Sequence, residues 1–524
     1  MKIKHKLQQA ATVYLTAFRG ILLGMLLVMS LAGCDAARQG QVTADVTPQL
    51  TSNATLTHQP SSTTTARPSR YATRTPAQTT PEATAPAVAT LGVEGKALDG
   101  LKITFWHVWS GQAGSVMQAM IDEYNRSNPW KVTVEASAFD SFASLEESFT
   151  AALSAGDPPS VLVAMDDQAQ RWNSSGRALV DLAPYVVDPD WGMNASEQAD
   201  FYPAFWQQGA AYEQTGGGRT LRQLSVPLHR FELVLYYNKT WAMELGYRQA
   251  PDTPGELSSQ ACGAARALSE TGQNELGGLM LSTLPASTAG REIILYPEQL
   301  LGWIGMFGGE VLLPAGENYQ FNTPEALRAF ELLKDLRQEG CIYLSDSPTP
   351  QDDFARRQAL FYLASTAELP DMRAAFLSAG NSDQWTILPF PADGGEPRPV
   401  AYGPSLVIPQ TSLEQQVAAW TLLEWLVTPS NQARWVQAIG AYPTRLSTRE
   451  LLEEATQADA TWGTGLELLA NAQAEPSHPS WGMVRWVMGD ALAELMSAEF
   501  VFEQIPSLLE TIDQVVAEVN NQVR

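Results

Sequence analysis

The chain has 524 residues, 45% of them hydrophobic, and it carries a formal net charge of −24 at pH 7. That length suits one large two-lobed unit or two domains, and the apolar fraction is enough to build a packed core. The excess of negative charge argues against nucleic acid as a partner and against membrane attachment through a basic patch. Composition therefore indicates a globular protein and does not identify its ligand.

The N-terminal residues have the pattern of a secretion signal. Only positive charges occur over residues 2–19, and a short apolar run over residues 20–33 then ends at Cys34. This run is shorter than the roughly 20 residues of a bilayer span. Residues 31–34 (Leu-Ala-Gly-Cys) also resemble the bacterial lipobox, whose cysteine becomes lipidated. We expect a signal peptide over residues 1–33 and lipidation at Cys34; an uncleaved anchor helix and an ordinary signal with a chance cysteine are the alternatives.

Residues 34–96 differ in composition from the rest of the chain. They are rich in threonine and proline, and Tyr71 is their only aromatic residue. Such a segment cannot bury enough apolar surface to offset the entropy of the chain, so it is expected to stay disordered. Frequent prolines favour extended conformations. We interpret this segment as a tether between Cys34 and a globular head; a spacer with no further role is the alternative.

A globular pattern begins near residue 98. β-branched and aromatic runs predict strands, and the helical spacing of apolar side chains predicts helices. The first of these are strands at 101–106, 131–135 and 160–164 and helices at 116–124 and 142–153. Alternation at this spacing is typical of an α/β domain with a mostly parallel sheet, whose ligands bind beyond the carboxyl ends of the strands.

Both kinds of element continue along the chain. Proline in the first turn and glycine after the last turn mark the clearest of the helices. The further predictions are strands at 233–238, 359–363 and 405–408 and helices at 324–338, 413–427 and, apart from a break at 476–479, 466–524.

The remaining cysteines are Cys262 and Cys341. In an oxidising compartment, a disulfide between them and two buried free thiols are both consistent with the sequence. Because the chain has no Cys-x-x-Cys pair, it lacks the ligand spacing of a zinc or iron–sulfur site. We therefore predict no metal and no cofactor.

Motifs of catalysis are absent from the globular part of the sequence. Its only histidines are His107, His229 and His478, and it has no HExxH, GxSxG, complete P-loop or calcium loop. Asp166 and Asp167 are adjacent, and neighbouring residues of a strand point to opposite faces, so they do not form one acid–base pair. We predict a binding protein rather than an enzyme, and keep a surface carbohydrate-active hydrolase as the less favoured alternative.

Ordered short motifs carry a family resemblance over about two-thirds of the chain. The most telling are VPL at 226–228, followed by LYYNK at 235–239 and PDTP at 251–254. Others in the family order are ITFWHVWSG at 103–111, ALSAGDPP at 152–159, GPSLVIP at 403–409 and residues 124–125, 129, 132–134, 179–182, 303, 308–309, 425–429, 435 and 442–444. Together they resemble the family 1 extracellular solute-binding proteins of ABC importers, which include the maltose- and glycerol-phosphate-binding proteins.

The resemblance implies a type II periplasmic-binding-protein-like fold of two α/β lobes. Three chain crossings would join the lobes, with the ligand in the cleft between them. One lobe would comprise 97–229 plus 360–403, and the other 236–358 plus 407–524 with a helical C-terminal tail. That tail and the glycine-rich residues 216–218 depart from the family pattern. Function would be closure of the hinge around ligand, in a form that the membrane permease recognises.

A sugar presents an apolar ring face and a rim of hydroxyls, so its site combines aromatic side chains with planar polar ones. For each candidate, core packing, a solvated loop or hinge support is the competing interpretation. By resemblance, the candidate ligand residues are Trp106, His107, Trp109, Asp140, Asp166, Asp167, Arg230, Glu232, Trp303, Gly403, Tyr442 and Arg445.

The resemblance also implies partners and a location. We expect a sugar or oligosaccharide as ligand, the transmembrane subunits of an ABC permease as partner, no nucleic acid, and a monomeric head. The chain would be held by its lipid at the outer face of the cytoplasmic membrane. A polyol-phosphate, a polyamine or another small solute is the alternative ligand, and an adhesin or a sensor input domain is the alternative role.

Overall fold

The computed structural model describes residues 90–523, except 216–217, 275, 286–291, 295 and 314–317. The predicted signal peptide, the lipidation site Cys34 and nearly all of the predicted tether lie outside the described residues. No helix in this part of the chain is both long and apolar enough to cross a bilayer.

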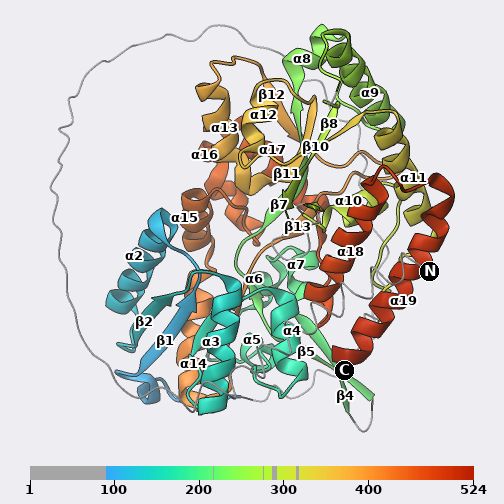
Figure 1. The fold of residues 1–524 in the computed structure, drawn as a ribbon. Coiled ribbons are helices and arrows are strands. Elements are labelled where there is room, and N and C mark those ends of the chain that lie inside the picture. The colour runs from blue at the N-terminus through green and yellow to red at the C-terminus, as the bar shows by residue number, and fades with distance from the viewer. Residues whose placement is uncertain are drawn as a thin grey trace, which may run out of the picture. The chain divides into compact units, whose positions relative to one another are not determined.

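The first sheet has five strands in the order β2-β1-β3-β14-β6. Its strands β1 and β2 lie side by side (Figure 1). β1 pairs in parallel with β2 and β3, whereas β14 pairs antiparallel with β3 and β6. The strands are β1 (Lys102–His107), β2 (Thr133–Ala138), β3 (Val161–Ala164), β6 (Val226–Pro227) and β14 (Ser405–Val407). Every residue of the central β3 is buried, as expected for a strand with both faces covered.

Helices pack beside this sheet and connect its strands. The local sequence explains their ends: α3 begins at a capping box on Ser141 and ends at Gly156, which has a left-handed backbone. The helices of the first lobe are α2 (Gly111–Ser127), α3 (Phe142–Ala155), α4 (Asp166–Ser174), α5 (Ala183–Val186), α6 (Ala195–Ala199), α7 (Pro203–Gln208), α14 (Leu413–Leu426) and α15 (Pro429–Ile439). A hairpin of β4 (Ala210–Thr215) and β5 (Gly218–Gln223) stands apart from both large sheets.

The second sheet is mixed, with the order β10-β8-β11-β7-β13-β15. β8, β10 and β11 are parallel to one another, and β7 pairs antiparallel with β11, β12 and β13; β9 extends β8. The strands are β7 (Phe231–Asn238), β8 (Leu279–Pro285), β9 (Glu292–Ile294), β10 (Ile342–Ser345), β11 (Phe361–Ser365), β12 (Trp385–Leu388), β13 (Val400–Tyr402) and β15 (Gln473–Ala474).

Helices cover both faces of the second sheet, because successive residues of β7 join different cores. Leu233 and Leu235 pack in one core, and Val234 and Tyr236 pack in the other. The core that contains Leu233 and Leu235 also holds side chains of five helices: α9 (Pro254–Glu270), α10 (Gln299–Gly305), α11 (Pro324–Gln338), α18 (Trp481–Met496) and α19 (Ile505–Val523). The core that contains Val234 and Tyr236 includes side chains of α12 (Pro350–Ala355), α13 (Leu369–Ser378) and α17 (Ala460–Leu468).

The two-lobed α/β fold is confirmed, but the segments divide between the lobes differently from the prediction. β11 and β13, within residues 360–403, pair with β7 and so belong to the second sheet. β14 lies between β3 and β6 of the first sheet, and α14 and α15 follow it there. Within the described residues the chain passes between the sheets three times: at 228–231, at 402–405 and between α15 and β15.

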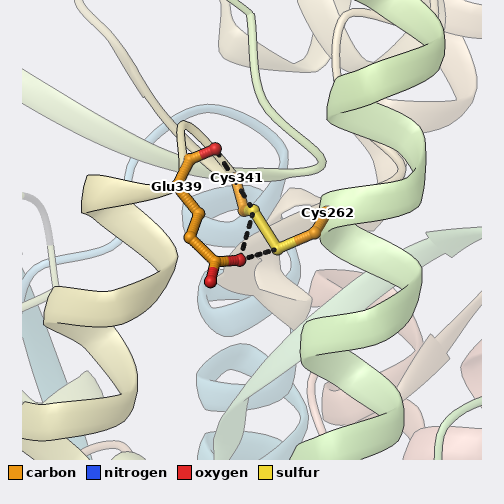
Figure 2. A group of neighbouring side chains, drawn as sticks. All are labelled: Cys262, Glu339 and Cys341. Atoms are coloured by element: carbon orange, nitrogen blue, oxygen red, sulfur yellow. Dashed lines mark hydrogen bonds between the residues drawn. A yellow bond between two sulfur atoms is a disulfide. The ribbon is translucent and has the colours of Figure 1, made fainter.

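Cys262 and Cys341 form a disulfide that ties α9 to the residue before β10 (Figure 2). The sequence had left this pairing open. Oε2 of Glu339 lies 3.5 Å from Sγ of Cys262, and both cysteines are buried. The bond closes a loop across 79 positions of the second lobe, which constrains the unfolded chain strongly.

Candidate ligand-binding cleft

The three crossings between the lobes meet in one place. Arg230, in the first crossing, and Tyr442, in the third, exchange both backbone hydrogen bonds, at 3.0 and 2.8 Å. Gly403, in the second, has φ +155°, and a Cβ there would come within 2.4 Å of the carbonyl oxygen of His229. Only glycine fits this close backbone approach. The crossings therefore form a single hinge bundle.

A buried ion pair links the first sheet to this hinge. Asp166, the first residue of α4, accepts hydrogen bonds from Ser225 at 2.6 Å and Ser405 at 3.1 Å, and lies 3.2 Å from Nη2 of Arg230. Arg230 donates further to the carbonyl oxygen of Pro404. Burial raises the pKa of Asp166, and the guanidinium of Arg230 opposes that shift. Because the carboxylate of Asp166 and the guanidinium of Arg230 are paired with each other, they stabilise the hinge and are not available to bind a ligand.

Half-buried aromatic rings run from the end of β1 toward the hinge. Trp106 packs against Phe139 with ring centroids 4.8 Å apart, and the ring of His107 stacks on Trp109 at 5.4 Å. Trp109 lies 6.0 Å from His229 in the first crossing. Trp106 and Trp109 remain partly exposed, so each keeps a ring surface that a ligand could cover.

Further aromatic rings continue this series into the second lobe. His229 packs edge-on against Phe231 at 5.5 Å, and Phe231 lies 6.2 Å from Tyr402 at the end of β13. Phe231 and Tyr402 are also half-buried. We call Trp109, Phe231 and Tyr402 the aromatic row. His229 in the first crossing links these rings, so the row extends from the first lobe into the second.

The two histidines of this region are neutral acceptors. Burial lowers the pKa of His107 to about 4 and that of His229 to about 3. Consistently, Nδ1 of His107 accepts from the backbone N–H of Trp109, and Nδ1 of His229 accepts from the indole N–H of Trp435. Both imidazoles thus orient aromatic rings and carry no charge at neutral pH.

A carboxylate surrounded by hydroxyl groups follows β11 in the second lobe. Glu368 accepts hydrogen bonds from the hydroxyls of Tyr296 at 2.5 Å and Tyr362 at 2.9 Å, and from Gln351. Nearby, the hydroxyl of Tyr402 lies 2.6 Å from Oγ of Ser365. We call Tyr296, Gln351, Tyr362 and Glu368 the Glu368 cluster.

Tyr296 has φ +56°, a left-handed backbone that is strained for a residue with a side chain. It is held there immediately before Pro297 while its hydroxyl reaches Glu368. Strain of this kind is concentrated at ligand-contacting sites. The Glu368 cluster therefore combines aromatic rings with polar groups in the way that a hydroxylated ligand requires.

The lobes also touch beyond the hinge, through the C-terminal tail. Nε2 of Gln208 donates to the carbonyl oxygen of Glu475 at 2.9 Å, and a Cβ on Gly482 of α18 would lie 3.0 Å from Oδ2 of Asp167. Asp167 itself pairs with Arg171 at 2.5 Å. Burial raises the pKa of Glu475 to about 8. The tail thus fills the second lobe's core and meets the first lobe at α4.

Several of the candidate residues lie elsewhere than predicted. Trp303 is fully buried in the core of the second lobe, with its indole N–H on Gln299 and its ring edge-on to Phe390, so it presents no face for stacking. Its apolar helix α10 packs inward, which a sequence pattern does not distinguish from a cleft position. Asp140 is exposed at the end of β2.

The remaining candidates are buried at or near the hinge. Glu232 is inaccessible to solvent, and burial raises its pKa well above the usual range. Tyr442 is also fully buried and stacks on Trp462. Arg445 lies 3.4 Å from Asp200 in the first lobe, away from the aromatic row. The structure thus brings together His107, Trp109, Arg230 and Gly403 at the lobe boundary, whereas the ring of Trp106 packs against Phe139 in the first lobe.

Sequence reasoning missed the second-lobe part of this arrangement. Phe231 and Tyr402 lie beside the predicted crossings between the lobes. That position in the sequence could have marked them as candidate ligand contacts. Tyr296 and Glu368 come from unrelated turns, and nothing local in the sequence marks them as neighbours.

The fold and this site define a class: a two-lobed periplasmic binding protein with a hinge of three crossings. Residues 119–463 match the family model described as bacterial extracellular solute-binding protein. Because the match covers more than half of the chain, the protein belongs to that family, whose members bind solutes and are not enzymes. It is an extracellular solute-binding protein of the ABC-importer type.

Curated relatives and solved structures agree with this assignment. The chain is 24% identical over 396 residues to the sn-glycerol-3-phosphate-binding periplasmic protein of Salmonella typhimurium, covering 72% of this chain and 82% of that protein. The sugar-binding protein MalE of Xanthomonas citri is 21% identical, with a TM-score of 0.66 over 80% of this chain and 98% of its own. UgpB of Mycobacterium tuberculosis, solved with glycerophosphocholine, is 18% identical, with a TM-score of 0.62 over 81% and 99%.

Proposed function

We propose that this protein captures a sugar or oligosaccharide between its lobes and delivers it to the permease of an ABC importer. The aromatic row is the observation that carries the proposal. Its three half-buried rings span the hinge, and the apolar faces of pyranose rings stack on such surfaces. In the Glu368 cluster, the half-buried Tyr296 and Glu368 supply polar groups that suit the hydroxyl rim of a sugar, whereas Tyr362 is fully buried.

A neutral sugar is favoured over a phosphorylated solute by the state of the two candidate arginines. Arg230 is enclosed and paired with Asp166, and Arg445 is paired with Asp200 in the first lobe. A phosphate group binds best to free guanidinium or ammonium groups. The relatives that bind glycerol phosphate make a polyol-phosphate the alternative ligand, and a polyamine is another.

Delivery to a permease requires that the protein stay near the membrane. We propose that Cys34 is lipidated and that residues 35–96 tether the head at the outer face of the cytoplasmic membrane. A Cys34→Ala variant is expected to appear in the soluble extracytoplasmic fraction, whereas the parent stays with the membrane. Retention of the variant on the membrane would contradict the lipid anchor.

The ligand class is tested by calorimetry and thermal shift of the purified protein. The panel comprises maltose and longer maltodextrins, other disaccharides, sn-glycerol 3-phosphate and spermidine. A ligand at about 100 times its dissociation constant adds about 2.7 kcal/mol to the free energy of unfolding, so a true ligand raises the melting temperature clearly. Binding of a sugar without turnover supports the proposal. Binding of sn-glycerol 3-phosphate or spermidine alone would contradict it.

A further inference from the structure

A cavity of about 910 Å³ lies in the first lobe, away from the aromatic row. The residues that line it belong to the end of α2 and the following loop, to residues 190–200, to the α14–α15 corner and to residues 445–447. Residues 445–447 lie in the third crossing, after Tyr442, and the other lining segments belong to the first lobe. No residue of the aromatic row or of the Glu368 cluster lines the cavity, so it is separate from the site proposed for the sugar.

Aromatic side chains form much of its wall. Trp130 and Trp191 lie with ring centroids 5.3 Å apart, and Tyr124 meets Trp425 edge-on at 5.6 Å. Tyr124 is fixed by its hydroxyl, which lies 2.7 Å from Oγ1 of Thr421. Tyr124 and Trp191 are buried, and Trp130 and Trp425 are half-buried. The wall is thus held rigid by its buried rings while the half-buried ones face accessible space.

The charges around the cavity are mainly negative. Four carboxylates, Asp190, Glu197, Asp200 and Glu424, line it together with one guanidinium, that of Arg445. Arg445 is already engaged, because it lies 3.4 Å from Asp200, donates to the carbonyl oxygen of Glu197 and covers the ring of Phe201. One carboxylate, therefore, neutralises this arginine and three remain.

Glu424 differs from the other acids of the cavity. Asp200 accepts from Ser447 at 2.6 Å, and Glu197 accepts the backbone N–H of Asn194 at 2.8 Å. In the described part of the chain, the half-buried carboxylate of Glu424 has no hydrogen-bond or ion-pair partner. It lies next to Trp425 on α14, at the wall of the cavity.

We propose that this cavity is a second binding site, for a small organic cation that carries an alkylammonium group. The ring faces of Trp130 and Trp425 would contact the cation, and Glu424 would supply the counter-charge. Tryptophan binds ammonium groups more strongly than the other aromatic residues do, and partly desolvated sites strengthen the contact. An anion is disfavoured because acidic side chains outnumber the single guanidinium of Arg445 around the cavity.

Electrostatics around Glu424 give the proposal a distinctive signature. Burial raises its pKa to about 8, Glu197 raises it further and Arg445 opposes the shift. Asp190, Asp200 and Tyr124 are the other titratable groups that face the cavity. A bound cation favours the ionised carboxylate, so binding at neutral pH must release a proton. Affinity should therefore rise as the pH approaches the pKa of about 8 from below.

The test is calorimetry of the full mature protein with choline, tetramethylammonium and putrescine. As a matched probe, 3,3-dimethyl-1-butanol has the shape of choline and no charge. Choline is expected to bind and the neutral isostere to bind at least about tenfold more weakly. Titrations in two buffers with different ionisation enthalpies are expected to show proton release at neutral pH. Equal affinity for choline and the isostere would overturn the proposal, and so would no measurable binding of any of the three cations at millimolar concentration.

Two variants locate the site. Glu424→Gln is expected to weaken choline at least about tenfold and to abolish the proton release. Trp109→Ala, in the aromatic row, should leave choline binding unchanged while it weakens the sugar. If Trp109→Ala instead weakens choline and Glu424→Gln does not, the cation binds between the lobes and the first-lobe site is wrong. Because the sugar and the cation are measured separately, failure of one proposal is distinguishable from failure of the other.

Discussion

The carboxylate of Asp166 lies 3.2 Å from Nη2 of Arg230, and both side chains are shut off from solvent. This pair fastens the carboxyl end of the first sheet to the first crossing between the lobes. Asp166 and Arg230 were predicted to contact the ligand, and in the structure they hold the hinge together instead. Removing one partner leaves the other as an unpaired buried charge, which is far more costly than the pair is stabilising.

Arg230→Met is therefore expected to lower the free energy of unfolding by about 3–5 kcal/mol, as measured by urea denaturation. The matched control is Arg434→Met, which breaks the exposed pair with Glu123, with 46% of each side chain accessible. That control should cost less than about 1 kcal/mol. The double variant Asp166→Asn with Arg230→Met should cost less than the sum of the single variants. A loss in Arg230→Met no greater than in the control would contradict the role of the pair.

Gly403→Ala is expected to destabilise the protein by about 1–3 kcal/mol, because the new Cβ meets the carbonyl oxygen of His229 at 2.4 Å in a backbone conformation that favours glycine. Gly395→Ala is the control, since a Cβ there meets no atom within 4 Å. Thermal unfolding compares the two variants. If both melt like the parent, the crossings are not as closely packed as described.

Glu475 should make the stability depend on pH. Its pKa is raised from 4.5 to about 8 in the folded protein, so the folded state holds a proton that the unfolded state has lost. The contribution is fully present below pH 4.5 and disappears as the pH rises through about 8. Glu475→Gln should therefore lose less stability than the parent between these values, measured by denaturation across the range. Parallel curves for the parent and the variant would be the contrary outcome.

Reduction of the disulfide between Cys262 and Cys341 is expected to lower the free energy of unfolding by about 4 kcal/mol, given the length of the loop that it closes. Denaturation with and without a thiol reductant measures the effect, and alkylation followed by mass spectrometry counts the free thiols. A double serine variant is the control, because reductant should not change its stability. Two free thiols in the unreduced protein would show that the bond does not form.

Local patterns in the sequence predicted many of the elements, and long-range pairing limited the rest. The tail predicted as helical over 466–524, apart from 476–479, also contains the strand β15 and a second break between α18 and α19. The helix predicted at 324–338 has those bounds, because proline at its start and four apolar residues at helical spacing define it. The lobe assignment was wrong because Ser405 pairs with Ala164, more than 200 positions away, and no local signal encodes that register. Burial was equally hard to foresee: Trp303 and Trp109 were both predicted to contact the ligand, yet one lies in a core and the other is half-buried.

The central claim is that the aromatic row holds a sugar between the lobes, and the affinity of the Trp109→Ala variant tests it most directly. Trp486→Ala is the control, since that tryptophan is 42% exposed on α18. With the best sugar of the panel, calorimetry should show at least about tenfold weaker binding for Trp109→Ala, which is about 1.4 kcal/mol, and unchanged binding for the control. An unchanged dissociation constant in Trp109→Ala, with its melting temperature intact, would contradict the account.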